Sequence, residues 1–169
     1  AGYDPALHTP GAADPEFACE ANQDLACTWG AVRVLWALNA VPRTGRTPVV
    51  ERAIADSVDF LLRCSLTQGS TPSHVSSRWF TLSYPLAHAT DILLALEVLA
   101  EAGASRAQLK DAAELVRSKR SAQGRWRMER SLNDRMWADV EAQGQPSKWV
   151  TLRAVRTLKR LEENFPTSG

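Results

Sequence analysis

The sequence predicts an all-α protein built from α-hairpin repeats. Three apolar segments begin in a similar way, near Trp29, Ala89 and Trp149, and positions about 60 residues apart are typical of stacked or circularised repeats. Stretches with the amphipathic pattern of surface helices lie between them. The resulting order is buried, amphipathic, buried, amphipathic and final helix. This order favours hairpins in which one helix of each pair faces inward.

The first two helices are expected over about 25–41 and 48–64. The first is apolar nearly all round, interrupted only by Arg33 and Asn39, so it should be buried on most sides. The second is expected to be an outer helix with an apolar face and a charged face. Those faces consist of Ile54, Val58, Leu61 and Leu62, and of Arg52, Asp56, Asp59 and Arg63.

In the middle of the chain, the sequence predicts a Ser- and Thr-rich loop followed by a short extended segment and two helices. The extended segment is expected over 78–84, because it is rich in aromatic residues and ends at Pro85. A very apolar third helix, about 86–102, should stop at Gly103. A fourth, about 105–121, has basic residues near its C-terminus. Its apolar face consists of Leu109, Ala112, Ala113 and Val116.

A long loop, 122–146, precedes the fifth helix, and three large side chains should anchor it. These are Trp126, Met128 and Trp137. Ser147 follows a proline at the N-cap position of the final helix, expected over about 147–164.

The domain organisation is therefore an irregular arm over 1–23, a helical domain over 24–164 and a tail over 165–169. Two and a half hairpins do not close a ring. The inner faces are expected to meet a second copy, in a homo-oligomer, or a missing N-terminal half.

The composition is that of an ordinary globular domain, with 44% hydrophobic and 23% charged residues. A net charge of +1 gives no general attraction to nucleic acid or to an anionic membrane. No apolar run reaches the ~20 residues that span a bilayer. Three cysteines without a dense framework favour free thiols and a cytoplasmic location. The chain begins without Met or a signal-peptide pattern, so we expect a processed or truncated piece.

Several motifs resemble a known group of proteins. They are Gly124-Arg125-Trp126…Glu129, Pro146-Ser147-Lys148-Trp149-Val150-Thr151-Leu152-Arg153-Ala154, Phe17-Ala18-Cys19-Glu20, Cys27-Thr28-Trp29-Gly30-Ala31 and Tyr84-Pro85…Thr90-Asp91. The group consists of uncharacterised bacterial and archaeal proteins with prenyltransferase/squalene-cyclase-type repeats, some loosely labelled nitrogen-fixation proteins. The resemblance implies an α/α toroid of the terpenoid-cyclase class, of which this chain would be the C-terminal half and an incomplete ring. It implies no particular reaction.

Cyclisation is disfavoured by the absence of the acidic DxDD motif that class II terpene cyclases use to protonate an alkene. The nearest pattern, Asp56 and Asp59, lies on the charged face of the second helix.

Cys27, His88 and Asp91 are the candidate catalytic residues. The inner helices of a toroid begin around one mouth, where their free N–H groups favour anions. Cys27 at such a terminus could act as a nucleophile and His88 as its base. Asp91 lies three residues later and could orient the imidazole. The more ordinary role of Asp91 is to cap a helix.

A more distant comparison, with protein prenyltransferases, suggests a zinc site. Protein prenyltransferase β-subunits hold zinc with an Asp and a Cys before one inner helix and a His at the start of another. Asp24, Cys27 and His88 occupy comparable positions, and such ligands with one open position suit catalytic zinc. However, the spacing from Asp24 to Cys27 is one residue longer than in that family, and its Gly-rich repeats are missing. The alternative is a buried cysteine beside a hydrogen-bonded histidine.

Six residues are candidates for substrate contact: Trp29, Arg33, Tyr84, Glu129, Lys148 and Trp149. Tryptophans can line an apolar cavity and stabilise cations, although at helical spacing they more often belong to the core. Arg33 must find a carboxylate or carbonyl partner, for which Glu129 and Asp91 are candidates. The arginines between 117 and 135 predict either a solvated helix end and loop or an anion site.

The function expected from these patterns is that of a small enzyme acting on an apolar or ester-like small molecule at the inner-helix N-termini. A hydrolase is favoured over a cyclase. The alternative is a non-catalytic binding or assembly module that completes a toroid with a partner or a second copy.

Overall fold

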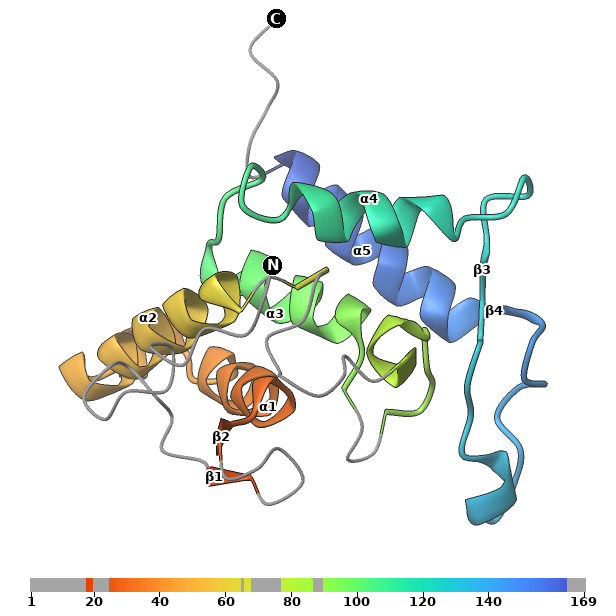
Figure 1. The fold of residues 1–169 in the computed structure, drawn as a ribbon, viewed down its shortest axis with the longest axis horizontal. Coiled ribbons are helices and arrows are strands. Elements are labelled where there is room, and N and C mark those ends of the chain that lie inside the picture. Colours follow the sequence, from red (N-terminus) through yellow and green to blue (C-terminus); the bar gives the residue numbers. More distant parts are fainter. Residues whose placement is uncertain (1–17, 20–24, 65, 68–76, 87–89, 164–169) are drawn as a thin grey trace, which may run out of the picture.

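The computed structural model describes residues 18–19, 25–64, 66–67, 77–86 and 90–163, and this part is mostly helical, as predicted (Figure 1). The five α-helices are α1 (Thr28–Asn39), α2 (Pro48–Arg63), α3 (Ile92–Ala102), α4 (Lys110–Ser118) and α5 (Lys148–Glu163). Two short antiparallel pairs join β1 (Ala18–Cys19) to β2 (Leu25–Ala26) and β3 (Trp126–Arg127) to β4 (Pro146–Ser147). No helix in the described ranges has the length and apolarity that crossing a membrane requires.

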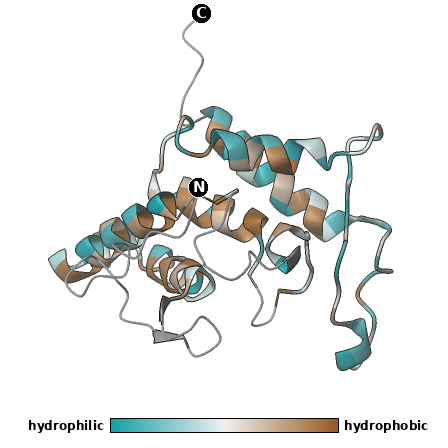
Figure 2. Ribbon diagram, viewed as in Figure 1, coloured by the Kyte–Doolittle hydropathy of each residue, from teal (hydrophilic) through white to brown (hydrophobic). Residues whose placement is uncertain are grey.

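Helix α3 lies at the centre and packs against each of the other four α-helices. Its buried residues run almost without interruption from Ile92 to Ala100, which gives it the mostly brown ribbon of Figure 2. The predicted very apolar helix is thus a core helix. Its apolar surface holds α1 and α2 on one side and α4 and α5 on the other (Figure 1).

Helix α1 is less buried than predicted. Only Ala31, Val32 and Leu35 are buried, and Trp36 is 50% exposed. The prediction of burial on most sides is wrong, because α2 and α3 pack on only part of the α1 surface. Trp29 and Leu38 are partly buried against the core, whereas Trp36 faces outward within the described chain.

Polar side chains set where three of the helices begin. Ser147 caps α5 as predicted, because its hydroxyl accepts a hydrogen bond from the Val150 amide at 3.0 Å. Thr47 caps α2 in the same way, before a proline at the first helical position. Helix α3 begins later than predicted, because the Asp91 carboxylate accepts from the Leu94 amide at 2.8 Å and so fixes the start at Ile92.

Helix α4 is shorter than predicted. Ser105 and Gln108 hydrogen-bond each other's backbone N–H, which closes a separate turn before the helix begins at Lys110. The predicted apolar face is nevertheless confirmed, since Leu109, Ala112, Ala113 and Val116 are all buried.

The predicted stop of α3 at Gly103 is confirmed. Gly103 has φ +95°, and the Ala104 amide donates to the Leu99 carbonyl at 2.9 Å. This left-handed C-terminal cap is the conformation that glycine adopts most readily.

The predicted extended segment over 78–84 is wrong. Its first half belongs to a 3₁₀ turn, η4 (Ser77–Phe80), and the Trp79 indole N–H donates to the Leu66 carbonyl at 2.8 Å. Strand-like pairing is confined to Ser83, which bridges to Arg130.

Of the three side chains predicted to anchor the loop between α4 and α5 in the core, two do so. Trp126 and Met128 are buried, whereas Trp137 is fully exposed. Pairing of β3 with β4 holds the first two against the helices, and Trp137 follows the 3₁₀ turn η5 (Asn133–Arg135), where the loop extends away from them (Figure 1). This part of the ribbon is mostly teal in Figure 2.

Of the predicted arm, only residues 18–19 lie within the described chain.

Candidate functional site

Asp91, at the start of α3, is a fully buried carboxylate that connects three segments of the chain. Its oxygens accept hydrogen bonds from the Ser83 amide at 2.9 Å and the Leu94 amide at 2.8 Å. Arg153 of α5 places Nη2 3.6 Å from Asp91 Oδ1 and Nε 3.3 Å from Glu97 Oε2. Its Nη1 also donates to the Ser83 carbonyl. Asp91 and Arg153 therefore join the 83–86 segment, α3 and α5.

Burial raises the pKa of Asp91 above its ordinary value. The charge of Arg153 and the amide hydrogen bonds from Ser83 and Leu94 act in the opposite direction, because they favour the ionised form. Burial is the largest of these effects, so the folded protein holds the Asp91 proton more tightly than the unfolded chain.

This shift predicts a pH dependence of stability. A group with a raised pKa contributes stability below its unfolded value, near 3.8, and loses that contribution as pH rises through its folded pKa. We expect the unfolding free energy of the wild type, minus that of Asp91→Asn, to fall as pH rises above 3.8 and then to level off. Urea unfolding at a series of pH values measures this difference. A difference that rises with pH would show that Arg153 outweighs burial.

Arg33 of α1 lies close to this group. Its Nε donates to Thr90 Oγ1 and its Nη2 to the Leu86 carbonyl, both at 3.3 Å. The carbonyl partner expected from the sequence is therefore present. Burial lowers the pKa of Arg33, the charge of Asp91 raises it, and the charge of Arg153 lowers it further. The guanidinium also lies 5.3 Å from the ring centroid of Trp36.

Glu129 supports the backbone of the 82–84 segment. Its Oε2 accepts from the Leu82 amide at 2.6 Å, and its Oε1 lies 2.7 Å from Lys119 Nζ. Both oxygens of this predicted substrate-contact residue thus have partners within the chain.

Three other predicted substrate-contact residues come together at the start of α5. The rings of Tyr84 and Trp149 stack with centroids 5.3 Å apart and planes 10° apart. Lys148 Nζ lies 5.6 Å from the Trp149 ring centroid. These contacts join the 83–86 segment to the first turn of α5.

An arginine-lined pocket with an empty volume of about 550 Å³ opens beside the 83–86 segment. It is lined by Trp29, Arg78, Ser83, Pro85, Arg130, Ser131, Leu132 and Arg135. Three of these residues are arginines and none is acidic. Within the described ranges, Arg130 forms no ion pair, and Arg135 reaches only the exposed Asp134, at 4.0 Å. The pocket therefore presents a concentration of positive charge beside an indole ring.

Backbone hydrogen bonds join two walls of this pocket. The Tyr84 amide donates to the Arg130 carbonyl at 3.2 Å, and the Arg130 amide donates to the Leu82 carbonyl at 3.3 Å. The two segments lie far apart in sequence, so the pocket forms only when the loop after α4 packs onto the 82–84 segment.

The structure places two of the three candidate catalytic residues at helix starts. Cys27 is the N-cap residue of α1 and is partly buried, and Asp91 caps α3, so its predicted capping role is confirmed. Thr90 Oγ1 donates to the Trp29 carbonyl at 3.4 Å, which links these two helix starts. His88 lies outside the described residues.

Two of the three proposed zinc ligands, Asp24 and His88, also lie outside the described residues. Among the side chains that the structure does describe, no three histidine, cysteine, aspartate or glutamate residues form a group that could hold a metal ion. The zinc site stays a prediction.

Sequence reasoning missed Arg78, Arg130 and Arg153. The arginine-rich stretch between 117 and 135 carried the signal for Arg130, since an anion site was one of its two interpretations. Arg153 had a weaker signal, a charge next to the apolar face of α5.

Comparison with protein-family models, with curated proteins and with solved structures finds no match to this chain.

Proposed function

We propose that this protein binds a small molecule that carries an oxyanion on an apolar body, in the arginine-lined pocket. The observation that carries the proposal is that Arg78, Arg130 and Arg135 line one pocket without an acidic neighbour in its wall. Guanidinium groups offer paired donors whose spacing matches the oxygens of carboxylates and phosphates. Such contacts strengthen where the surroundings exclude water.

The apolar wall restricts the ligand further. Trp29, Pro85 and Leu132 offer a surface for an aromatic or aliphatic group next to the arginines. Arg130 forms no ion pair within the described ranges and Arg135 has only the exposed Asp134 at 4.0 Å, so this wall favours a negatively charged group. A phosphate monoester of an apolar alcohol combines these features, and it is compatible with the apolar or ester-like molecule expected from the sequence.

Replacing Arg130 with glutamine tests this function. We expect Arg130→Gln to weaken binding of phenyl phosphate by about tenfold to a hundredfold, because one charged hydrogen-bond donor contributes roughly 1.5–3 kcal/mol. Isothermal titration calorimetry measures the affinity. Benzoate, which has the same ring and one charge fewer, is expected to bind more weakly than phenyl phosphate.

Arg127→Gln is the matched control. Arg127 is exposed on β3, lies three residues before Arg130 and does not line the pocket. The two variants change the net charge equally, so a purely long-range effect would weaken binding equally in both. Equal losses, or no binding of phenyl phosphate by the wild type, would refute the proposed function.

Hydrolysis in this pocket stays a proposal from the sequence. Cys27 lies two residues before Trp29, which lines the pocket, and this proximity supports it. Asp91 is buried with partners on both oxygens, so it would orient another group rather than contact the substrate. The toroid arrangement is likewise a proposal, supported by the link between the starts of α1 and α3.

Assembly with a second copy is the alternative function, and one observation favours it. Trp149, Leu152 and Val155 recur along the solvent side of α5 and are 37%, 48% and 45% exposed. An apolar row on a helix surface is typical of a face that packs against another chain.

A further inference from the structure

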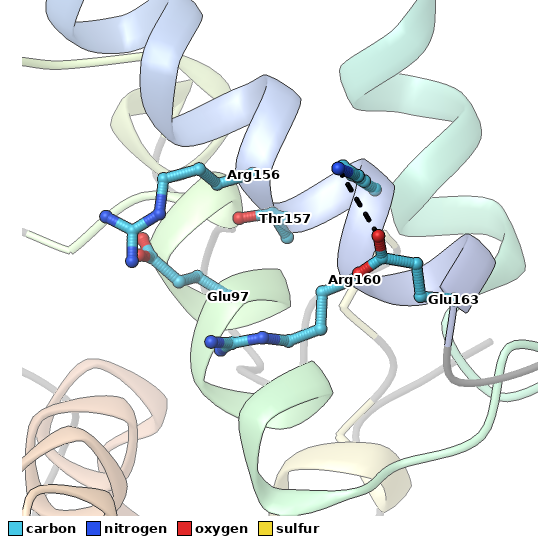
Figure 3. A pocket seen from close by; sticks show the side chains of 6 residues that line it. Glu97, Arg156, Thr157, Arg160 and Glu163 are labelled. Carbon is cyan, nitrogen blue, oxygen red and sulfur yellow. Dashed lines mark ion pairs between the residues drawn. The ribbon is translucent and has the colours of Figure 1, made fainter.

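A second pocket lies between α3 and α5, on different side chains from the arginine-lined pocket (Figure 3). Its empty volume is about 530 Å³. One side comes from Glu97 of α3, and the rest comes from α5. The α5 residues are Arg156, Thr157, Lys159, Arg160 and Glu163.

Thr157 gives this pocket a buried hydroxyl group without a partner. The residue is 3% exposed, and its Oγ1 has no hydrogen-bond partner among the described residues. Buried hydroxyl groups are nearly always hydrogen-bonded, and a threonine within a helix commonly bonds the carbonyl one turn earlier. In Figure 3 the Thr157 oxygen points instead toward the space between Arg156 and Glu97. This hydroxyl therefore keeps an unused hydrogen bond at the wall of the pocket, and its oxygen is itself buried.

The charges around the pocket leave one cation without a counter-charge. Glu97 pairs with Arg153 at 3.3 Å, Arg160 with Glu101 at 3.5 Å and Lys159 with Glu163 at 3.4 Å. Arg156 forms no ion pair in the part of the chain that the structure describes. One guanidinium without an ion pair and one hydroxyl without a partner thus line the same pocket, and each can donate a hydrogen bond to an oxyanion.

We infer that this pocket binds a carboxylate group, held by the Arg156 guanidinium and the Thr157 hydroxyl. A single negative charge balances the one unpaired cation, whereas a dianion would leave one negative charge unbalanced in a pocket whose wall also carries Glu97 and Glu163. The carboxylate belongs to a free small acid or to the C-terminus of a peptide, since both present the same two oxygens. The site is independent of the proposed phosphate-ester pocket.

An NMR titration of the full chain with three probes tests the inference. The probes are acetate, an N-acetylated tripeptide with a free C-terminus, and the same tripeptide amidated. We expect saturable shifts of the Thr157 amide and of Arg156 Nε with the first two probes and none with the amidated peptide. Tighter binding of acetate identifies a small acid as the ligand, and tighter binding of the free peptide identifies a chain terminus.

Two variants separate this site from general charge effects. Arg156→Gln is expected to weaken carboxylate binding about tenfold, and Thr157→Val about threefold to tenfold. Thr157→Val should leave the Tm unchanged or raise it, because it removes a buried hydroxyl that has no partner. Arg127→Gln, at an exposed residue that lines neither pocket, should leave carboxylate binding at this pocket unchanged.

Three results would overturn the inference. The first is equal shifts with the free and amidated peptides, and the second is unchanged affinity in Arg156→Gln. The third is a lower Tm for Thr157→Val, since it would show that the hydroxyl already has a partner inside the protein. None of these results bears on phenyl phosphate binding, so the two sites can fail separately.

Discussion

Replacing Asp91 with alanine is expected to lower the free energy of unfolding by about 3–5 kcal/mol. The substitution leaves the Ser83 and Leu94 amides without their acceptor. It also removes a counter-charge from Arg153, whose side chain is only 13% exposed. Three segments lose a shared contact at once, so the effect exceeds that of an ordinary helix cap.

Asp91→Asn separates the charge from the hydrogen bonds. Its amide oxygen can still accept from one backbone N–H, so we expect a smaller loss, of about 1–3 kcal/mol. Urea unfolding, followed by circular dichroism, measures both variants. Asp139→Ala is the control, because Asp139 is exposed and should change stability by less than about 0.5 kcal/mol. If Asp91→Ala matched that control, the Asp91–Arg153 contact would not hold the fold together.

The second large effect is expected at Trp126. Trp126→Ala should lower the unfolding free energy by about 3–5 kcal/mol, because it leaves a large cavity in the core. The indole is 2% exposed, and its N–H donates to the Val116 carbonyl of α4 at 2.6 Å. Its backbone amide donates to Thr151 of α5, so the residue holds two helices together.

Trp126→Phe and Trp137→Ala complete this test. Phenylalanine keeps much of the apolar volume, so a loss of about 1–2 kcal/mol is expected from the missing hydrogen bond and the smaller ring. Trp137 belongs to the same loop and is fully exposed, so Trp137→Ala should change stability by less than about 0.5 kcal/mol. Thermal unfolding monitored by calorimetry checks the order of the three variants. A comparable loss at both tryptophans would contradict the packing described here.

The predictable features of this fold are those governed by neighbours in sequence. The start of α5 at Ser147 and the end of α3 at Gly103 follow from capping chemistry that spans only a few residues. The buried face of α4 follows from helical periodicity alone. Helix α3 starts later than the predicted bound near residue 86, because periodicity alone does not fix a helix start, whereas Asp91 is recognisable from the sequence as a cap.

Contacts between distant segments explain the remaining differences. Trp126 and Trp137 are the same residue type in one loop, and only the pairing of β3 with β4 distinguishes the buried one from the exposed one. The arginine-lined pocket likewise depends on Arg130 meeting Ser83, across a separation that no local pattern encodes. The site was therefore harder to predict than the helices.

The backbone bonds between Arg130 and the 82–84 segment also affect the thermodynamics of binding. They fix the main chain of Arg130 before any ligand arrives. The Glu129 carboxylate, which accepts from the Leu82 amide, fixes the segment to which Arg130 is bonded. Binding then restricts mainly the rotamers of the arginine side chains, at about 0.5–1.5 kcal/mol for each one immobilised. A preformed wall of this kind leaves most of the ligand's interaction energy for affinity and selectivity rather than for ordering a loop.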